Sequence, residues 1–600
     1  MILTLYTLVR KICKVFILIL LSYFNLGQQH YNIGAMEVTS INFEDVLPKV
    51  KKSIKEATFI TFDCEFTGLN AISNINAFDT IDEYYNKVKK NCKDFLVIQF
   101  GLSAFRYDKL ESAFKQSTYN FYIFRKPLDR NIPDQRFLCQ SSSINFLISQ
   151  GFDFNKLFKE GIPYLNLEEE NQYQQNLVEK HKVISSRATK STDKIAIPPN
   201  DKPFIDDIIK TIQQYLEGGS DEPIQLPKCN PFLRKLIYQT SEDMFTDLVR
   251  VETKQLDNKE KVLNVTRVKS SDELKSIEQQ KLDEDNKIFQ EYIGFTKVLR
   301  YIVDSGVLVV GHNLMLDLVH TIDKFLTPLS EDYNEFKECT HALFPQILDT
   351  KFMSSREEFK DIINSNVLGH LLDSVKKEPF EIPKCEIEKG CCGYSLEDKK
   401  EHEAAFDAFM TGISFLAMWN YLGKDKNLET DEIFSDFNLL KPYINRIHLM
   451  RLQDNQFIHF GGVDPKPSRD HVFHISFPKD WKVSDIQQLF SPFGNVFISW
   501  INDISAFVGL YKRDQANMAF SCLSNHTSCA VTKYSEYKDR NYVGSDRGLR
   551  RKSDESCFKD VKKRKVALEN SIDELKIPKA ALQKKKSGNT KTFVENEAWD

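Results

Sequence analysis

The chain has 600 residues, too many for one ordinary hydrophobic core, and this length indicates three or four domains. Hydrophobic residues make up 41% and charged residues 28%, a globular composition with room for solvated linkers. The formal net charge of −4 excludes a general electrostatic attraction for nucleic acid, so any RNA-binding surface must be local. The 12 cysteines lie singly except for Cys391 and Cys392, which favours reduced thiols in a cytosolic or nuclear protein.

The first 35 residues contain an apolar run, 15–26, that follows basic residues in the order typical of a signal peptide or an anchor. The run is short for a membrane span. A signal, a membrane anchor and an upstream extension ahead of a start at Met36 all fit this pattern. We favour the extension, with the anchor second, because neither the thiols nor the chemistry below suits secretion. A membrane partner is therefore expected only if residues 1–35 are a genuine anchor.

The first globular segment has the pattern of a sheet. Apolar runs at 57–69, 94–105 and 119–126 have the character of buried strands, so we expect a mixed sheet to begin here. From about 168 to 199 the chain is polar and lacks periodicity. The spacing at 204–216 is helical and is followed by a Gly-Gly-Ser break, which indicates a small domain inserted into a larger one.

Regular apolar patterning resumes at about Phe289, after a charged segment at 268–288 that suits a solvated helix or linker. The stretch 298–326 predicts a helix, a strand and a helix in series, and 344–355 adds a strand. A further helix is expected at about 398–421. Alternating elements of this kind indicate an α/β sheet.

A new pattern begins at His471 and continues to about Glu536. Its order is strand, helix, strand, strand, which is that of a ferredoxin-like RNA-recognition module. Residues 541–600 carry 15 Lys and Arg against 10 Asp and Glu, with few aromatic residues, and are expected to be disordered. The run Lys562-Lys563-Arg564-Lys565 suits a nuclear import signal and a solvated charge run equally well.

Two carboxylates mark the first predicted strand. Asp63 and Glu65 lie two residues apart, which places both side chains on the same face of the strand. They are embedded among apolar residues such as Phe62 and Phe66, so burying the pair without a cation would be costly. Taken alone, an Asp-x-Glu pair is explained more simply as an exposed strand end.

Further candidates follow later in the chain. Asp317 comes after a predicted strand and the turn Gly311-His312-Asn313, so it should project from the start of a helix toward the end of that strand, where α/β proteins build sites. His402 precedes Asp407 by five residues, and a histidine in the preceding loop can reach over a site. A solvent-facing histidine explains that spacing about as well.

The order Asp-x-Glu, Gly-His-Asn-x-x-x-Asp, His-x-x-x-x-Asp resembles the DEDD exonuclease superfamily in its histidine-containing branch. In-line attack of water on a phosphodiester needs stabilised charge on the attacking and leaving oxygens, which two divalent ions about 3.5–4 Å apart provide. Oxygen ligands favour Mg²⁺ or Mn²⁺ over zinc. A histidine is suited to accept the proton of the attacking water.

Longer stretches across roughly residues 37–540 resemble the poly(A)-specific ribonuclease family. They are FDCEFTGL, DFLVIQFGL, CQSSSINFLISQGFDFNKLF, GIPYLN, RKLIYQT, GHNLMLDLVHT, LDTKFM and HVFHISFPKDW. The resemblance implies an α/β fold: a ribonuclease H-like DEDD exonuclease domain with a mixed sheet, split by a small inserted α/β single-strand nucleic-acid-binding-like domain and followed by a ferredoxin-like RNA-recognition module. The predicted boundaries are 1–35 for the extension, 36–195 and 266–445 for the two parts of the exonuclease domain, 196–265 for the insertion, 466–540 for the module and 541–600 for the basic tail.

The resemblance also assigns roles to single residues. The implied catalytic set is Asp63, Glu65, Asp317, His402 and Asp407, of which the four carboxylates hold two Mg²⁺ ions. The implied path of the 3′-terminal adenosines is lined by Phe66, Leu69, Ile144, Phe146, Asn313 and Lys351. Apolar and aromatic surfaces of this kind grip single strands by stacking, although Phe66, Ile144 and Phe146 also suit a hydrophobic core.

The chain departs from the expected patterns in two places. The inserted domain has Arg234-x-x-x-Tyr238 where the founding single-strand-binding motif has a histidine. The recognition module carries Phe473, Phe477 and Phe507 without the basic-Gly-aromatic signature of a typical sheet-surface RNA binder, so much of this phenylalanine is expected in the core.

The family resemblance implies a site for the 5′ cap of mRNA in the recognition module. Trp500 is our candidate for it, because an indole can stack on a cationic methylated guanine by a cation–π attraction of about 0.5–2 kcal/mol. Trp481 is the alternative, although its place before a predicted helix suits packing. The resemblance further implies a homodimer.

The predicted function is a 3′-to-5′ exoribonuclease that removes poly(A) tails, releases 5′-AMP and is stimulated by the cap. Its expected setting is mRNA decay and non-coding RNA 3′-end maturation, in the nucleus and the cytoplasm. The alternatives are a related exonuclease that trims small-RNA precursors and a catalytically silent RNA- or cap-binding protein. The module at 471–536 favours the first function over the trimming enzyme, and five intact catalytic positions argue against a silent protein.

Overall fold

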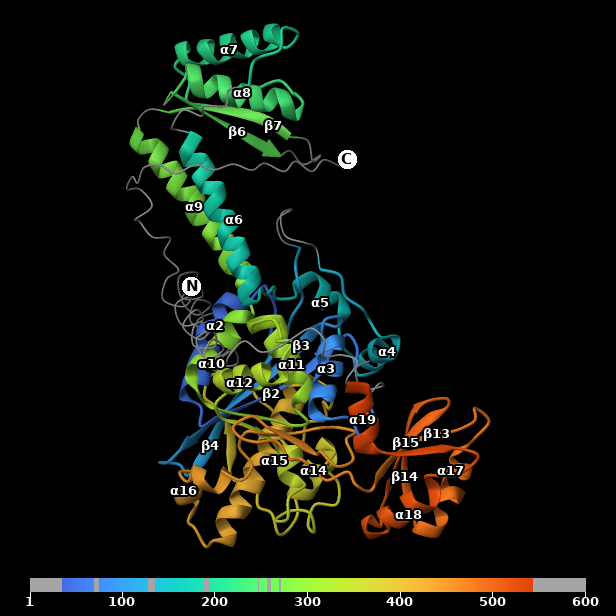
Figure 1. The fold of residues 1–600 in the computed structure, drawn as a ribbon. Helices are drawn as coiled ribbons and strands as arrows, with labels where there is room; N and C mark the ends of the chain where they lie inside the picture. The colour runs from blue at the N-terminus through green and yellow to red at the C-terminus, as the bar shows by residue number, and fades with distance from the viewer. Residues whose placement is uncertain are drawn as a thin grey trace, which may run out of the picture. The chain divides into compact units, whose positions relative to one another are not determined.

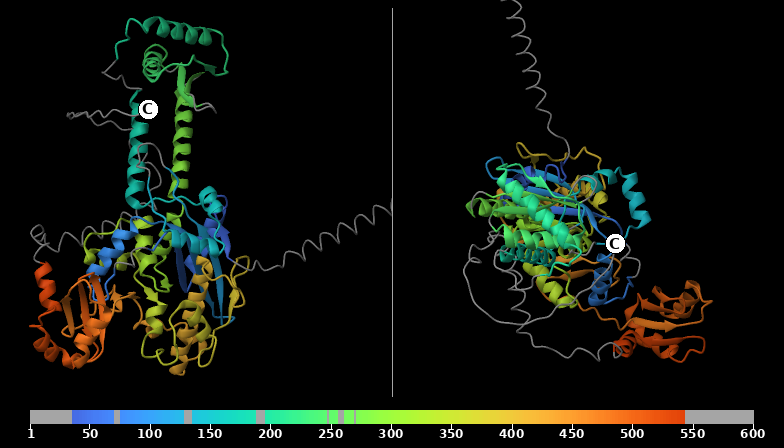
Figure 2. Two further views of the ribbon diagram at one scale, coloured as in Figure 1. Left: turned by 90° about the vertical axis from the view of Figure 1, so that its right-hand side faces the viewer. Right: turned by 90° about the horizontal axis from the view of Figure 1, so that it is seen from above.

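The computed structural model describes residues 35–69, 75–127, 135–187, 195–246, 248–255, 261–268 and 271–542. The predicted extension lies outside these residues except for Ala35, and so does the tail from residue 543 with its basic run. The described residues form two compact units (Figures 1 and 2). Among them, no helix combines the length and the apolar character needed to cross a membrane.

The larger unit is built on a mixed sheet that has nine strands within the described residues. The strand order is β1-β4-β3-β2-β8-β9-β11-β12, with β10 beside β4. Strands β2, β3 and β4 are antiparallel neighbours, whereas β2, β8, β9 and β11 run parallel. The bounds are β1 Met36–Val38, β2 Phe59–Phe66, β3 Val97–Asp108, β4 Ala113–Tyr122, β8 Leu308–Gly311, β9 Ile347–Asp349, β10 Cys385–Ile387, β11 Arg446–His448 and β12 Phe457–His459. The predicted mixed α/β sheet is thus observed, and it continues beyond residue 445 into β11 and β12.

The long helix α15 (Ala404–Asp425) lies against β2 and β3 and is buried along most of its length. Its residues Phe415 and Trp419 belong to a core cluster that also contains Phe59 of β2. Other helices of this unit are α2 Phe43–Glu56, α3 Ile81–Cys92, α4 Ser141–Ser149, α5 Phe154–Glu160, α10 Thr296–Ser305, α11 Met315–Thr321, α13 Thr350–Ser354, α14 Leu368–Val375 and α16 Thr430–Ile433, whereas α12 Tyr333–Leu343 groups with the smaller unit. The apolar side chains of the strands are therefore covered by helices with matching apolar faces.

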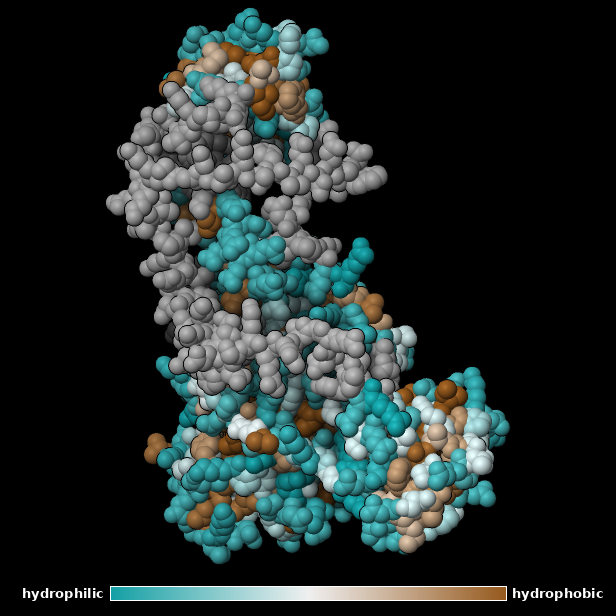
Figure 3. Space-filling model, viewed as in Figure 1, coloured by the Kyte–Doolittle hydropathy of each residue, from teal (hydrophilic) through white to brown (hydrophobic). Residues whose placement is uncertain are grey.

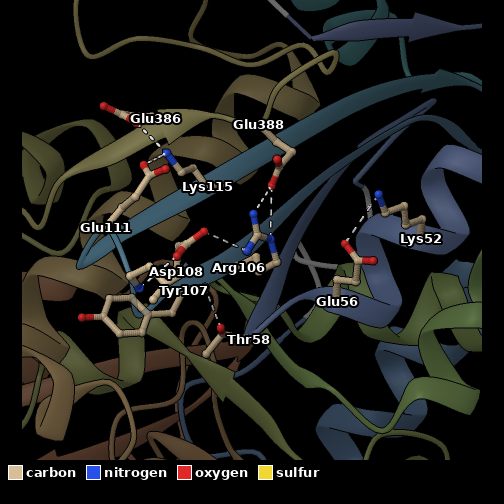
Figure 4. A network of polar contacts seen from close by, with 11 residues as sticks. Lys52, Glu56, Thr58, Arg106, Tyr107, Asp108, Glu111, Lys115, Glu386 and Glu388 are labelled. Atoms are coloured by element: carbon tan, nitrogen blue, oxygen red, sulfur yellow. Dashed lines mark hydrogen bonds and ion pairs between the residues drawn. The ribbon is translucent and has the colours of Figure 1, made fainter.

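Ion pairs fasten β10 to the sheet, as Figure 4 shows. Lys115 of β4 contacts Glu386 of β10 at 2.7 Å, and Arg106 of β3 contacts Glu388, just beyond β10, at 2.6 Å. These residues are partly exposed, so each pair contributes only modestly to stability. Their consequence is positional, because the chain after β10 leads into the loop that carries His402.

The inserted segment has a core of its own. Helices α7 (Lys202–Glu217) and α8 (Pro231–Met244) pack on a sheet of order β5-β7-β6, formed by Ile224–Gln225, Lys261–Arg267 and Val249–Gln255. In the degenerate motif, the Tyr238 hydroxyl contacts the Thr253 hydroxyl at 2.9 Å. The tyrosine at this position therefore forms a hydrogen bond to β6 within the insertion.

Two long helices, α6 (Leu167–Arg187) and α9 (Ser271–Ile293), connect the insertion to the sheet and pack on each other (Figure 1). The ring of Tyr173 stacks on that of Phe289 with centroids 5.2 Å apart. The absence of periodicity that we read over 168–199 did not reveal α6, because this helix is stabilised by contacts with a distant segment and not by an amphipathic pattern of its own.

The smaller unit contains a four-stranded sheet of order β14-β15-β13-β16. Its elements are β13 Val472–Ser476, α17 Val483–Phe490, β14 Val496–Asn502, β15 Ser505–Leu510, α18 Ala516–Leu523, β16 Ala530–Lys533 and α19 Tyr534–Tyr542. This is the ferredoxin-like order predicted from the sequence. Phe473 and Phe477 lie in its core as expected. Phe507 is also buried, but against Tyr534 and Tyr537 of the terminal helix.

Candidate active site

The site begins on β2, where Asp63 and Glu65 project from the same face of the strand. Asp63 lies opposite Gly101 in the antiparallel pairing with β3. Both carboxylates are partly exposed, whereas Phe62 beside them is fully buried. The strand thus presents two acidic side chains on a surface that remains open.

The start of α15 lies unusually close to β3. A Cβ atom at Gly101 would stand 2.1 Å from the backbone of Ala404, so only glycine permits this approach. Gln99 accepts a hydrogen bond from the Ala404 backbone N–H at 3.0 Å, and the Thr61 hydroxyl donates to the Ala408 carbonyl at 2.7 Å. These contacts bring the first turn of α15 over β2, and Asp407 belongs to that turn.

Three carboxylates meet as a result. Oxygen atoms of Asp63, Glu65 and Asp407 all lie within 4.8 Å of one another, a spacing at which they could share a metal ion. Asp317, in the first turn of α11, joins them through the backbone: its Oδ1 atom accepts the N–H of Cys64 at 3.0 Å. The four acidic residues predicted from the sequence therefore converge at one edge of the sheet.

The electrostatics of this cluster favour neutralisation. Burial raises the pKa of Asp63, and the neighbouring carboxylates of Asp317, Asp407 and Glu65 raise it further. Burial, then Asp407 and Asp317, likewise raise the pKa of Glu65. Burial also raises the pKa of Asp317 and of Asp407 to about 7. Like charges in a partly desolvated site repel one another, and a divalent cation is the natural group to relieve this repulsion.

The residues present fit Mg²⁺ or Mn²⁺. The ligand atoms are carboxylate oxygens, which hard divalent ions prefer, and no cysteine or histidine belongs to the described three-residue group. Asp63, Glu65 and Asp407 would hold such an ion, with Asp317 adjacent. The chemistry that it would supply is stabilisation of charge on the phosphate oxygens.

His402 lies in the loop directly before α15 and is exposed. It adopts the left-handed conformation, with φ of 71°, and its backbone N–H donates to Oδ1 of Asp407 at 3.2 Å. Its ring meets that of Phe146 edge-on, with centroids 4.8 Å apart. Phe146 and His402 lie far apart in the chain, so no local pattern of the sequence predicts their contact.

The predicted poly(A)-path residues differ in exposure. Leu69 is 43% exposed and Phe146 is 40% exposed, so both offer apolar surface near the site. Ile144 of α4 is half-buried. Phe66 is 8% exposed and packs on the ring of His320, which agrees better with a core role.

The other two predicted path residues follow β8 and β9. Asn313 has a φ of 59°, and Lys351 belongs to the first turn of α13. The backbone N–H groups of both donate to Oδ1 of Asp349 at 2.9 Å. Asp349 was not among the sequence candidates, although its place at the end of a parallel strand was a signal that could have identified it.

In the recognition module, Trp500 lies on the edge strand β14 and is 40% exposed. Trp481 stacks on Phe477 at a centroid distance of 5.7 Å, which suits packing. Figure 3 shows apolar patches among hydrophilic residues on the visible face of this unit. The indole of Trp500 is therefore partly exposed on this edge strand.

Comparisons with known proteins agree with this architecture. The CAF1 family ribonuclease pattern matches residues 38–415, and an RNA binding domain matches residues 462–540. The chain is 40% identical over 544 residues to the poly(A)-specific ribonuclease PARN of Xenopus laevis, covering 88% of this chain and 85% of that protein. The human PARN is also 40% identical, over 542 residues, with 88% and 84% covered. The chain belongs to the poly(A)-specific ribonucleases of the CAF1 family.

Family membership confirms the predicted family, fold class and enzyme class, and it makes RNA a partner of this chain. A pre-piRNA 3′-exonuclease trimmer of Bombyx mori is similar at a lower level, with 26% identity over 519 residues that cover 84% of this chain and 94% of that protein. The identities therefore favour the poly(A)-specific ribonucleases over the trimming enzymes.

Proposed function

We propose that this protein is a 3′-to-5′ exoribonuclease that removes poly(A) tails one adenosine at a time and releases 5′-AMP. The observation that carries the proposal is the meeting of Asp63, Glu65 and Asp407 within 4.8 Å in a chain 40% identical to poly(A)-specific ribonucleases. Two Mg²⁺ ions held by these residues and Asp317 would supply charge stabilisation at the phosphate.

The residues of the site support this chemistry. The water oxygen forms a bond to the last phosphorus of the RNA, and the bond from that phosphorus to the 3′-oxygen of the preceding nucleotide breaks. His402, exposed beside Asp407, accepts the proton of the attacking water. Leu69 and Phe146 offer apolar surface for the terminal bases, and Asn313 and Lys351 the polar contacts.

We also propose that Trp500 binds the 5′ cap and that cap binding stimulates the exonuclease. In this proposal the protein is a homodimer of the nucleus and the cytoplasm. It acts in mRNA decay and in non-coding RNA 3′-end maturation. The exposed indole on β14 and the matched RNA binding domain support a ligand site in the module. Cys64 and Cys92 are buried free thiols, which suits a reducing compartment.

The deciding experiment uses the full-length chain, a 5′-labelled RNA ending in adenosines, and Mg²⁺. We expect a ladder shortened from the 3′ end, with 5′-AMP as the product. The Asp63→Asn variant should produce no ladder, whereas Asp45→Asn, at an exposed aspartate of α2, should match the unmodified protein. Equal activity of both variants would contradict the site, and release of a 3′-phosphorylated product would contradict the reaction.

A further inference from the structure

Asp349 is a buried carboxylate at the end of β9, with no part of its surface exposed. Strand β9 lies between β8 and β11, and all three run parallel, so their carboxyl ends meet at one edge of the sheet. Asp349 is therefore placed where the chain segments leaving β8 and β11 pass close to its side chain.

Both oxygens of Asp349 accept backbone N–H groups, three of them from these segments and one from Lys351, two residues further along the chain. Oδ1 accepts from Asn313 and from Lys351, each at 2.9 Å. Oδ2 accepts from Leu314 at 3.2 Å and from His448 at 3.0 Å. A buried carboxylate that is satisfied by four N–H donors holds its partners firmly, since losing any bond would leave a polar group unpaired in the interior.

The four donors are not arbitrary positions. Leu314 is the residue directly before α11, the helix whose first turn carries Asp317. Asn313 has a φ of 59°, in the left-handed region that asparagine adopts more readily than most non-glycine residues, and its N–H bond to Asp349 helps to hold it there. Lys351 is the second residue of α13, which Asp349 caps at its N-terminus.

We propose that Asp349 is a positioning residue for the nuclease reaction: its single carboxylate sets the helix that carries Asp317 together with the backbone of the two predicted RNA contacts. The carboxylate thereby fixes the distance between the acidic site and the residues proposed to contact the terminal adenosines, Asn313 and Lys351. This inference rests on the proposed function, because Asn313 and Lys351 are RNA contacts only in that proposal.

The test is a double-mutant cycle in the full-length chain with an oligo(A) substrate and Mg²⁺. Asp349→Asn preserves the volume of the side chain but turns an NH₂ group toward N–H donors, so the backbone must shift. We expect KM to rise about tenfold and kcat to fall about tenfold. The matched control is Asp153→Asn, at an exposed helix cap that accepts one N–H from Lys156, which should leave both constants unchanged.

Coupling separates positioning from a merely structural role. In the unmodified background, Asn313→Ala and Lys351→Ala should each raise KM about tenfold, and in the Asp349→Asn background each should raise it less than about threefold. Equal effects in both backgrounds would overturn the inference, and so would the absence of any effect in the unmodified background. If Asp349→Asn gives no folded protein in a thermal melt, the cycle is repeated with Asp349→Ser, whose hydroxyl can still cap α13.

Failure of both variants to fold would also overturn the inference, because Asp349 would then serve the fold alone. Failure of the proposed function is seen separately. In that case the unmodified protein leaves oligo(A) intact, whatever the variants do.

Discussion

The acidic site of the nuclease sheet and the sheet of the recognition module differ in how their side chains are satisfied. In the first, Asp63, Glu65 and Asp407 crowd together, and burial together with the neighbouring carboxylates raises the pKa of Asp63. In the second, His474 on the sheet stacks on Tyr537 of α19 at a centroid distance of 3.9 Å, so the chain covers its own aromatic face. Crowded carboxylates with raised pKa values indicate a place where a ligand binds, whereas an aromatic face covered by the chain's own helix indicates that a ligand binds at another surface.

The largest effect is expected from Asp407→Asn, which removes one of the three crowded charges. Activity should fall about 10³-fold or more, since the loss of even one preorganised group in a catalytic site commonly costs about 10²–10³-fold. The melting temperature of the metal-free protein should rise at the same time, because the repulsion is relieved. Kinetics and a thermal melt with a chelator measure both changes. A metal-free protein that becomes less stable would show that the cluster is not under electrostatic strain.

His402→Ala tests the exposed member of the site. We expect kcat on oligo(A) to fall about 10²-fold, the low end of the range for a general base, while the Mg²⁺ concentration for half-maximal activity stays unchanged. Phe146→Leu, which removes the ring edge that meets His402, should lower kcat in the same direction but less. An unchanged kcat in His402→Ala would assign the proton transfer to another group.

The stability of the metal-free protein should depend on pH. Burial raises the pKa of Asp317 and of Asp407 to about 7, whereas an unfolded aspartate titrates near about 3.9. The folded state thus binds more protons than the unfolded chain between about pH 4 and 7, and stability falls as pH rises through that window.

Mg²⁺ should reverse this trend. An ion that binds only the folded protein stabilises it by about 2.7 kcal/mol at 100 times its Kd, and it competes with protons for the carboxylates. The gain in melting temperature on adding Mg²⁺ should therefore be larger near about pH 7.5 than near about pH 5. Melts at both values, with Ca²⁺-free buffer and a chelator as the reference, measure it. Equal gains at the two values would place the bound ion away from these carboxylates.

The sequence predicted those parts of the site that follow from local periodicity. Asp63 and Glu65 share a face because a strand repeats every two residues, and Asp317 follows a strand and a turn whose pattern is plain. Their joint assignment to a nuclease came from the family resemblance. Spacing alone left His402 and Asp407 undecided.

The parts that the sequence did not reveal depend on contacts between distant segments. Gly101 is an ordinary strand residue until the start of α15 is known to lie 2.1 Å from where its Cβ would be. Asp349 carries no local signal of three of its four donors, which come from the segments of the two neighbouring strands; only Lys351 is close in sequence. Helix α6 is fixed by its pairing with α9, as in the stack of Tyr173 on Phe289. Tertiary contacts of this kind are set by the whole fold and not by a window of sequence.

The smallest effects are expected in the recognition module. Here one tryptophan, Trp500, and one tyrosine, Tyr537, test whether the ligand binds at the exposed edge strand or at the covered aromatic face. Trp500→Ala should lower the stimulation by a capped substrate about threefold, within the range of one cation–π contact, and leave the uncapped rate unchanged. Tyr537→Ala should lower the melting temperature of the module, because it uncovers His474 and Phe507, but leave cap stimulation intact. Paired assays with capped and uncapped RNA measure both variants. The opposite result, in which Tyr537→Ala abolishes the stimulation and Trp500→Ala does not, would place the ligand site on the sheet face that α19 covers. In that case α19 would itself be part of the site, because a ligand can use a covered face only if the covering helix contributes to binding.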